Sequence, residues 1–247
     1  MQLQDRQAET TKRWTWLSLA RIGAGGFVIW AITLQLGAGF IDPIITSLGL
    51  IYAAWIWLLD PERRGRLVAF TVFAALTMVP NIVFGSSDFT HVESAGSFIP
   101  QLFVTLCIGL AIVGGAGELR QWSTDAARTV LGRVAAVFAL GAAVSLVVSA
   151  TAPSDDALVD DVAVVASGFA WEPGVVTYDA SNASGLWVDN RDFAHHAFAV
   201  PDLGIDVQLP ASKARRVELG DVASGQYQIV CTIPGHENMT GTLVVTG

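Results

Sequence analysis

Near the end of the chain, residues 231–241 read CTIPGHENMTG. This segment places Cys231, His236 and Met239 in one short loop, with four residues between the cysteine and the histidine and two between the histidine and the methionine. A thiolate and a thioether beside an imidazole form a soft ligand set that suits copper. Such copper sites take two histidines and a cysteine as strong ligands and a methionine as a long axial ligand, so the pattern predicts a second histidine from another strand.

An earlier segment, residues 187–198, reads WVDNRDFAHHAF and offers two candidates for this second histidine. Neighbouring residues of a strand point to opposite faces, and His196 shares its face with the apolar residues Ala194, Phe198 and Val200. We therefore expect His196 to face a buried site. His195 is expected to be an exposed strand residue, with a hydrogen bond to the site as the alternative.

The part of the chain that carries these segments is expected to be all β. Short runs of β-branched and aromatic residues alternate with turn residues, which is typical of a β-sandwich or barrel. The predicted strands are 162–166, 175–178, 185–188, 195–200, 215–219, 226–231 and 242–245. Residues 151–161 are acidic, contain Pro153 and lack an apolar period, so they are expected to form a solvated linker.

The two ligand segments resemble the cupredoxin, or plastocyanin/azurin-like, family. The resemblance covers residues 162–247, and its motifs are WVDN at 187–190 before His196, GQY at 225–227 before Cys231, PG at 234–235 before His236, and TGTLVV at 240–245. It implies an all-β Greek-key domain that binds one copper ion through His196, Cys231, His236 and Met239. It also implies a type 1 (blue) copper site that cycles between Cu(I) and Cu(II).

Two positions depart from the family's pattern. Many members have three or four residues between the second histidine and the methionine, whereas this chain has two, which leaves Glu237 and Asn238 as alternatives to Met239 for the axial position. Many members also have a polar residue after the first histidine that ties the two ligand loops together, whereas this chain has Ala197. Hydrogen bonding around the ligands is therefore expected to differ from the family's usual pattern.

The first part of the chain is expected to lie in a membrane, because 52% of all residues are hydrophobic and 15% are charged, against about 25% charged in an average soluble protein. Five stretches approach the roughly 20 apolar residues that cross a hydrocarbon core, namely 22–41, 44–59, 67–84, 98–117 and 134–150. The predicted organisation is a five-helix transmembrane region at 1–150, a linker at 151–161 and a copper domain at 162–247. Only Asp42 and Pro43 separate the first two stretches, so a re-entrant pair is the alternative there.

Basic residues predict the orientation, because they stay on the cytoplasmic side of a membrane. The connections 42–43 and 85–97 contain none, while the other ends carry Arg6, Lys12, Arg13, Arg21, Arg63, Arg64, Arg66, Arg120, Arg128 and Arg133. Trp14, Trp16, Trp55, Trp57 and Trp122 fall at the same predicted cytoplasmic boundary. The chain is therefore predicted to be a multi-pass protein of the cell membrane with a cytoplasmic N-terminus and an extracytoplasmic copper domain.

The predicted function is transfer of single electrons, without enzymatic activity of its own. Copper delivery or storage is one alternative, although it would favour methionine-rich or histidine-rich tracts and the chain has three methionines and four histidines. A copper-bearing subunit of a membrane oxidoreductase is the other. The expected partners are the lipid bilayer, redox proteins and, as a subunit, other membrane proteins. Nucleic acid is excluded, because acidic residues dominate the β part.

Overall fold

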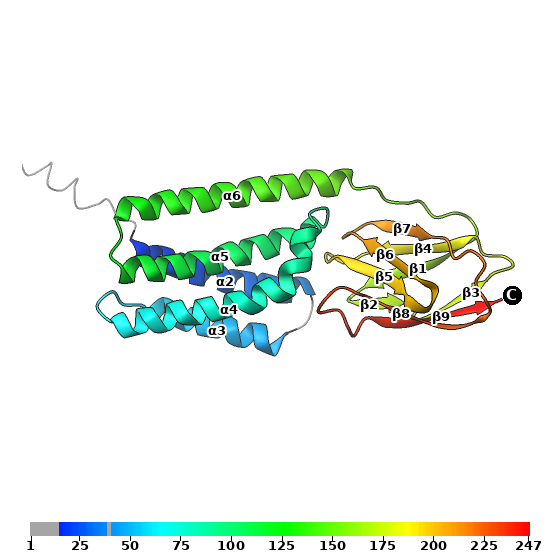
Figure 1. Ribbon diagram of the computed structural model, residues 1–247, viewed down its shortest axis with the longest axis horizontal. Helices are drawn as coiled ribbons and strands as arrows, with labels where there is room; N and C mark the ends of the chain where they lie inside the picture. The colour runs from blue at the N-terminus through cyan, green and yellow to red at the C-terminus, as the bar shows by residue number, and fades with distance from the viewer. Residues whose placement is uncertain (1–14, 39–40) are drawn as a thin grey trace, which may run out of the picture. The chain divides into compact units, whose positions relative to one another are not determined.

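The helical region has five helices in the part of the chain that the structure describes, residues 15–38 and 41–247. This computed structural model places them at α2 (Trp16–Ala38), α3 (Pro43–Leu58), α4 (Arg64–Thr90), α5 (Ala95–Leu119) and α6 (Thr124–Thr151) (Figure 1). Each predicted apolar stretch coincides with one helix. Residues 39–40 of the first stretch, and Arg6, Lys12, Arg13 and Trp14 from the orientation argument, lie outside the described residues.

Four of the described helices, α2, α4, α5 and α6, are long and apolar enough to cross a membrane. The remaining helix, α3, has 16 residues and starts at an N-cap formed by Asp42, whose side chain accepts hydrogen bonds from the backbone N–H groups of Ile44 and Ile45. The predicted fifth span depends on this short helix, so five spans and the re-entrant pair both stay predictions.

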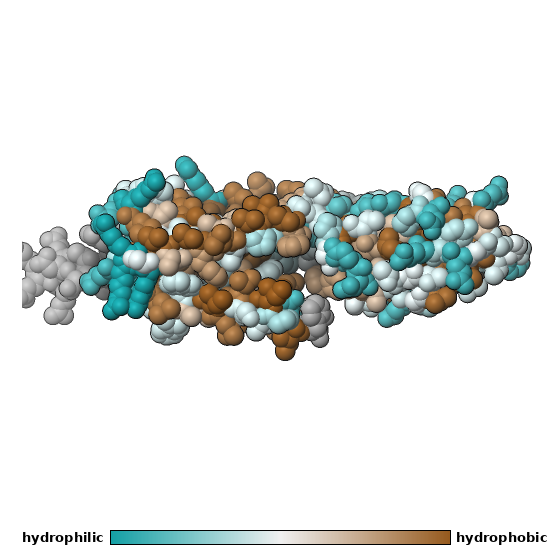
Figure 2. All heavy atoms as spheres, turned by 60° about the horizontal axis from the view of Figure 1, so that its bottom comes forward, coloured by the Kyte–Doolittle hydropathy of each residue, from teal (hydrophilic) through white to brown (hydrophobic). Residues whose placement is uncertain are grey.

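The outward surface of the helices is largely apolar. Leu36, Trp57 and Leu140 are more than two-thirds exposed, at 78%, 88% and 68%. Figure 2 shows brown apolar residues over much of the helical region and mostly polar colours over the β domain. Inside the helical region, Tyr52 and Phe70 are fully buried. Apolar surface of this extent marks a site of interaction with lipid or protein, and membrane anchoring is a plausible role for these helices.

The connection between α4 and α5 is shorter than predicted. The sequence predicts an outer loop at 85–97, whereas α4 continues to Thr90 and α5 begins at Ala95. The helix extends beyond the apolar stretch. An apolar run identifies the part of a helix that would lie in lipid, but it does not identify the ends of the helix. The remaining turn is closed by the Ser94 N–H, which donates to the His91 carbonyl.

The β domain consists of nine strands in two sheets. One sheet has the order β2 (Ala170–Glu172), β1 (Asp161–Ser167), β4 (Gly185–Asn190), β7 (Ala214–Val217); the other has the order β3 (Val175–Asp179), β9 (Thr240–Thr246), β8 (Gly225–Val230), β5 (His196–Val200), β6 (Ile205–Leu209). β1 pairs with β4 and β3 with β9 in parallel, while the other pairs are antiparallel. One buried apolar cluster contains Leu186 of the first sheet and Phe198 and Leu243 of the second, so the core lies between the sheets.

All seven predicted strands are present, and the β-sheet domain is confirmed, whereas the Greek-key connection stays a prediction. Two further strands, β2 and β6, are not among those predicted from the sequence. β2 has only three residues, which is too short for a periodic signal. β6 reads IDVQL and alternates apolar and polar residues, so the chain does carry a strand signal there.

Residues 152–160, which the composition predicts to be a solvated linker, are mostly exposed and also form hydrogen bonds to the β domain. The Ser154 hydroxyl accepts a hydrogen bond from the Ala214 N–H at 3.0 Å, and the Asp155 carboxylate accepts one from the Arg216 N–H at 2.9 Å. The Asp155 carbonyl accepts from the Trp187 indole at 2.9 Å. β7 is the outer strand of its sheet, so these contacts satisfy an edge that would otherwise be open.

Contacts divide the chain into two compact units, and the division differs in detail from the predicted domain boundaries. One unit is Phe84–Gln101 together with Gly141–Gly247, and the other consists of the described residues up to Val83 together with Leu102–Leu140. The α4–α5 connection therefore belongs to the same unit as the β domain. The predicted boundaries at 150 and 161 stay predictions.

Candidate metal centre

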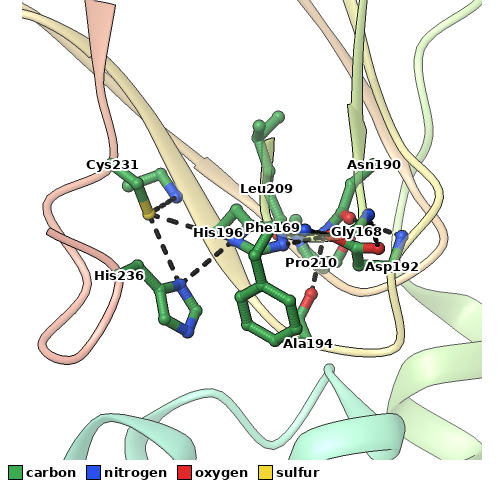
Figure 3. Close-up of polar contacts among 11 residues, drawn as sticks. Gly168, Phe169, Asn190, Asp192, Ala194, His196, Leu209, Pro210, Cys231 and His236 are labelled. Atoms are coloured by element: carbon green, nitrogen blue, oxygen red, sulfur yellow. Dashed lines mark hydrogen bonds and ion pairs between the residues drawn. The ribbon is translucent and has the colours of Figure 1, made fainter. Parts of the chain in front are cut away.

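Three of the predicted ligands come together beside the ends of two neighbouring strands. His196 is the first residue of β5, Cys231 directly follows β8, and His236 lies in the loop before β9. The His196 and His236 Nδ1 atoms are 3.1 Å apart, and Cys231 Sγ lies 3.9 Å and 3.6 Å from them (Figure 3). One potential ligand atom from each residue thus lies within 4.8 Å of the other two.

Asp192 orients the first of these ligands. Its Oδ2 atom lies 2.9 Å from His196 Nε2, and because a carboxylate only accepts, Nε2 carries the proton. The same carboxylate accepts hydrogen bonds from the Gly168 N–H at 2.7 Å and the Phe169 N–H at 3.0 Å, so it is itself fixed. His196 therefore presents an unprotonated Nδ1 atom toward Cys231 and His236, and metal-binding histidines normally donate their other ring N–H to a carboxylate or carbonyl in this way.

Cys231 is buried and receives a backbone hydrogen bond. The Ala197 N–H donates to Cys231 Sγ at 3.4 Å. Burial raises the pKa of the Cys231 thiol, and the backbone N–H groups of Ala197 and Ile233 oppose this increase. Ala197 lacks the polar side chain that many members of the similar family have at this position. It contributes to the site through its backbone N–H instead.

Aromatic and apolar surroundings keep both imidazoles neutral. Burial, and then the nearby His196, lower the pKa of His236 to about 4. Burial also lowers the pKa of His196, although Asp192 opposes this change. Phe169 contacts both rings edge to face, with ring centroids 5.4 Å from His196 and 5.0 Å from His236. Neutral imidazoles have the lone pairs that a metal ion requires.

The loop that carries Cys231, His236 and Met239 is closed by its own backbone. The Cys231 N–H donates to the Met239 carbonyl at 3.1 Å, and the Met239 N–H donates to the His236 carbonyl at 2.8 Å. Gly235 has a φ angle of +91°, which favours glycine at this turn. The side chain of Met239 is 1% exposed, so the structure buries the predicted axial residue within the loop, and its ligand role stays a prediction.

Neither of the two alternative axial residues is buried in the site. Glu237 and Asn238 are both exposed. The Glu237 carboxylate instead accepts a hydrogen bond from the Gly235 N–H at 2.9 Å, which lowers the pKa of Glu237 and supports the turn.

Asn190 ties the first ligand segment to its surroundings. It is fully buried, and its Nδ2 group donates to the carbonyls of Ala194, Leu209 and Pro210 at 2.9, 3.0 and 3.1 Å. Its Oδ1 atom accepts from the Asp192 N–H at 3.0 Å. The roles of Asn190 and Asp192 are not predicted from the sequence, although both residues lie in the segment 187–198; two polar residues shortly before the ligand histidine are the available signal.

The expectation of an exposed His195 is wrong. His195 is 2% exposed, and its two ring nitrogens lie 3.1 Å from Ser94 Oγ and 2.8 Å from Gln208 Oε1. Strand alternation correctly puts His195 and His196 on different sides, but the second side is covered by the α4–α5 connection. The pattern of one strand cannot reveal a cover from a distant part of the chain.

The donor set fits a copper ion. The buried site offers one thiol and two imidazole nitrogens, and the protonated Nε2 of His196 faces away from the other two donors. The two Nδ1 atoms are close enough to share a hydrogen bond, so one of them carries the proton of that bond. A bound metal cation would replace this proton. Soft sulfur combined with imidazole favours copper among the common metals.

The chain is similar to one protein family and to several solved structures. A family model described as a cupredoxin-like domain matches residues 136–245 and leaves the preceding helical region unassigned. Amicyanin from Paracoccus versutus (Thiobacillus versutus) is 21% identical, with a TM-score of 0.31, and the match covers 37% of this chain and 86% of that one. The Cu(I) form of a methionine-to-alanine amicyanin mutant is 17% identical, with a TM-score of 0.31 and coverage of 37% and 87%.

A copper-containing nitrite reductase from Thermus scotoductus SA-01 is also similar. It is 19% identical, with a TM-score of 0.30, and the match covers 39% of this chain but only 24% of the reductase. No curated protein matches the chain.

Proposed function

Because residues 136–245 match a cupredoxin-like family model, which implies a copper cofactor and electron transfer, we propose that the protein is a membrane-anchored type 1 copper protein. It transfers single electrons between redox proteins at the outer face of the cell membrane and is not itself an enzyme. The observation that carries the proposal is the convergence of His196, Cys231 and His236, whose ligand atoms lie within 4.8 Å of one another.

Some residues of the site would bind the copper ion, and others would orient these ligands. His196, Cys231 and His236 would be the strong ligands, and Met239, buried in the same loop, would be the axial ligand. When bound, copper supplies the Cu(I)/Cu(II) couple. Asp192 and the Ala197 N–H keep the donors oriented, and Phe169 limits water around both imidazoles. A ligand set fixed by its surroundings suits electron transfer, because it need not rearrange when the charge changes.

Spectroscopy of the copper-loaded full chain in detergent tests the type 1 site. We expect intense blue absorption from the thiolate-to-copper transition and a matching EPR signal of Cu(II). Cys231→Ser should abolish the blue band, because the thiolate is lost. Cys107→Ser is the control, since Cys107 is the only other cysteine and lies in α5. Blue colour that survives Cys231→Ser would refute the site.

Membrane orientation is proposed on the Lys/Arg distribution, and cysteine labelling in intact cells tests it. Val159 is 100% exposed in the segment before β1 and lies on the predicted outer side, whereas Gly65 is the second residue of α4 and lies on the predicted inner side. Val159→Cys should react with an impermeant thiol reagent, and Gly65→Cys should not. Labelling of Gly65→Cys alone would invert the topology.

A further inference from the structure

The α4–α5 connection, taken together with the first three residues of α5 as residues 91–97, packs on the segment that carries the first ligand. Ser94 is fully buried, and its hydroxyl lies 3.1 Å from His195 Nδ1 and 3.1 Å from the Ala211 backbone nitrogen. His195 directly precedes His196, and Ala211 follows Leu209, the β6 residue that pairs with His196. A single serine from the helical half of the sequence thus contacts both sides of the strand pair that holds His196.

The hydrogen bonds around Ser94 form a chain with one direction. Gln208 Oε1 can only accept, so His195 Nε2 carries the proton and donates at 2.8 Å. In neutral His195, Nδ1 therefore accepts from the Ser94 hydroxyl, and the Ser94 oxygen accepts from the Ala211 N–H. Gln208 Nε2 donates to Asp206 at 3.2 Å, which is consistent with this direction. Every polar atom of the His195 ring is satisfied, so the ring has one favoured position.

Close packing reinforces the contact. A Cβ atom on Gly96 would meet the carbonyl oxygen of Phe193 far inside contact distance, so only glycine lets the connection approach this closely. The His91 ring stacks on His195 with centroids 3.7 Å apart. On its other side, the connection accepts a 2.7 Å hydrogen bond from the Ser145 hydroxyl of α6 to the Val92 carbonyl.

His91, Glu93 and His195 also bring potential metal-ligand atoms within 4.8 Å of one another. However, both ring nitrogens of His195 have partners outside this group, Ser94 and Gln208, whereas His196 Nδ1 faces the other two proposed copper ligands. The group is therefore better explained as a packing and hydrogen-bonding contact than as a second metal site.

We infer that residues 91–97 are a built-in support of the copper site, and that Ser94 is a positioning residue for His196. Ser94 fixes His195 and the turn at Ala211, and these two points fix the backbone of His196. The inference rests on the proposed ligand role of His196. It gives the helical part of the chain a role beyond anchoring, since the connection between two of its helices would set the geometry of the ligands.

Ser94→Ala in the full chain tests the inference with two independent measurements. In the copper-free protein, hydrogen exchange of the segment around Ala211 should accelerate at least 10-fold, because the Ala211 N–H loses its acceptor. In the copper-loaded protein, the copper dissociation constant should rise about 10-fold, because His196 loses its fixed position, and the EPR hyperfine splitting should change. Ser224→Ala is the control, because its hydroxyl also has a backbone partner, the carbonyl of Gly247 at 2.7 Å, but not in the segments around His195 and Ala211.

Gly96→Ala provides a second, steric test, with Gly109→Ala as its control in the same helix. An added Cβ at Gly109 meets nothing within 4 Å, whereas one at Gly96 collides with Phe193. Gly96→Ala should reproduce both effects of Ser94→Ala, and Gly109→Ala should reproduce neither.

The outcomes separate this inference from the proposed function. Unchanged exchange around Ala211 in Ser94→Ala would overturn the contact itself. Faster exchange with unaltered copper affinity and EPR spectrum would overturn the positioning role. If the wild-type chain bound no copper, the proposed function and the positioning role would both fall, and the exchange measurement would still decide whether the connection packs on the β domain.

Discussion

The two segments that supply the ligands are held in opposite ways. Residues 231–239 are closed by hydrogen bonds within the loop, from Cys231 to Met239 and from Met239 to His236. The segment around His196 is held by contacts to other parts of the chain, from Asn190 to the Leu209 and Pro210 carbonyls and from His195 to Ser94 of the α4–α5 connection. One ligand loop is thus a local structure, while the other ligand depends on distant parts of the chain.

This difference predicts where the site is sensitive to mutation. In the self-closed loop, a substitution should act mainly on the residue changed. Around His196, a substitution far along the sequence should disturb the copper site, because the supports come from several elements. The following changes test that contrast.

Asn190→Ala should have the largest effect. It leaves the carbonyls of Ala194, Leu209 and Pro210 without their buried donor, which should lower the free energy of unfolding by about 3 kcal/mol. Urea unfolding of the copper-free protein measures this change. Asn182→Ala is the control, since Asn182 lies in an exposed turn and bonds Asp179, and it should cost well under half as much. Equal losses of unfolding free energy in Asn190→Ala and Asn182→Ala would contradict the expected sensitivity of the segment around His196.

Asp192→Asn should weaken copper binding by about 10-fold without unfolding the domain. The amide keeps the shape of the side chain but removes the negative charge that faces His196 Nε2 at 2.9 Å. Competition with a copper chelator gives the affinity. Asp189→Asn changes a neighbouring carboxylate that pairs with Arg191, and it should leave the affinity unaltered. An equal effect of both variants would point to net charge instead of orientation.

Gly235→Ala tests the self-closed loop. No atom obstructs an added Cβ, but the φ angle of +91° is unfavourable for alanine, so we expect a loss of about 1 kcal/mol confined to this loop. Gly174→Ala, at a position without a positive φ and with its nearest atom 3.9 Å away, should cost less. Calorimetry measures both. A loss for Gly235→Ala as large as that for Asn190→Ala would contradict the expected ranking.

Substitutions of Met239 should change stability least and the reduction potential most specifically. Met239→Leu should raise the potential, because loss of a weak donor destabilises Cu(II) more than Cu(I), and Met239→Gln should lower it through a harder oxygen donor. Redox titration of both variants measures the shifts. Identical potentials in wild type and both variants would mean that Met239 only packs in the loop, where it is buried.

The same contrast explains what the sequence could predict. Cys231, His236 and Met239 stand within one loop, so their spacing alone indicates a metal site, and the apolar stretches predict the helices equally well. Asp192, Asn190 and Ser94 act through the folded structure, and Ser94 is 101 residues from the histidine that it contacts. Alternation along β5 selects His196 but misplaces His195 in solvent, because alternation describes a strand and not what covers it.

The separation between Ser94 and Ala211 has a consequence for synthesis. The two residues are 117 positions apart, and Ser94 comes first. At about 5–20 residues per second, the α4–α5 connection leaves the ribosome roughly 6 to 23 seconds before Ala211 does. The β domain would therefore finish folding after the α4–α5 connection has been synthesised. The hydroxyl of Ser94 would be available as a hydrogen-bond partner when β5 and β6 first pair.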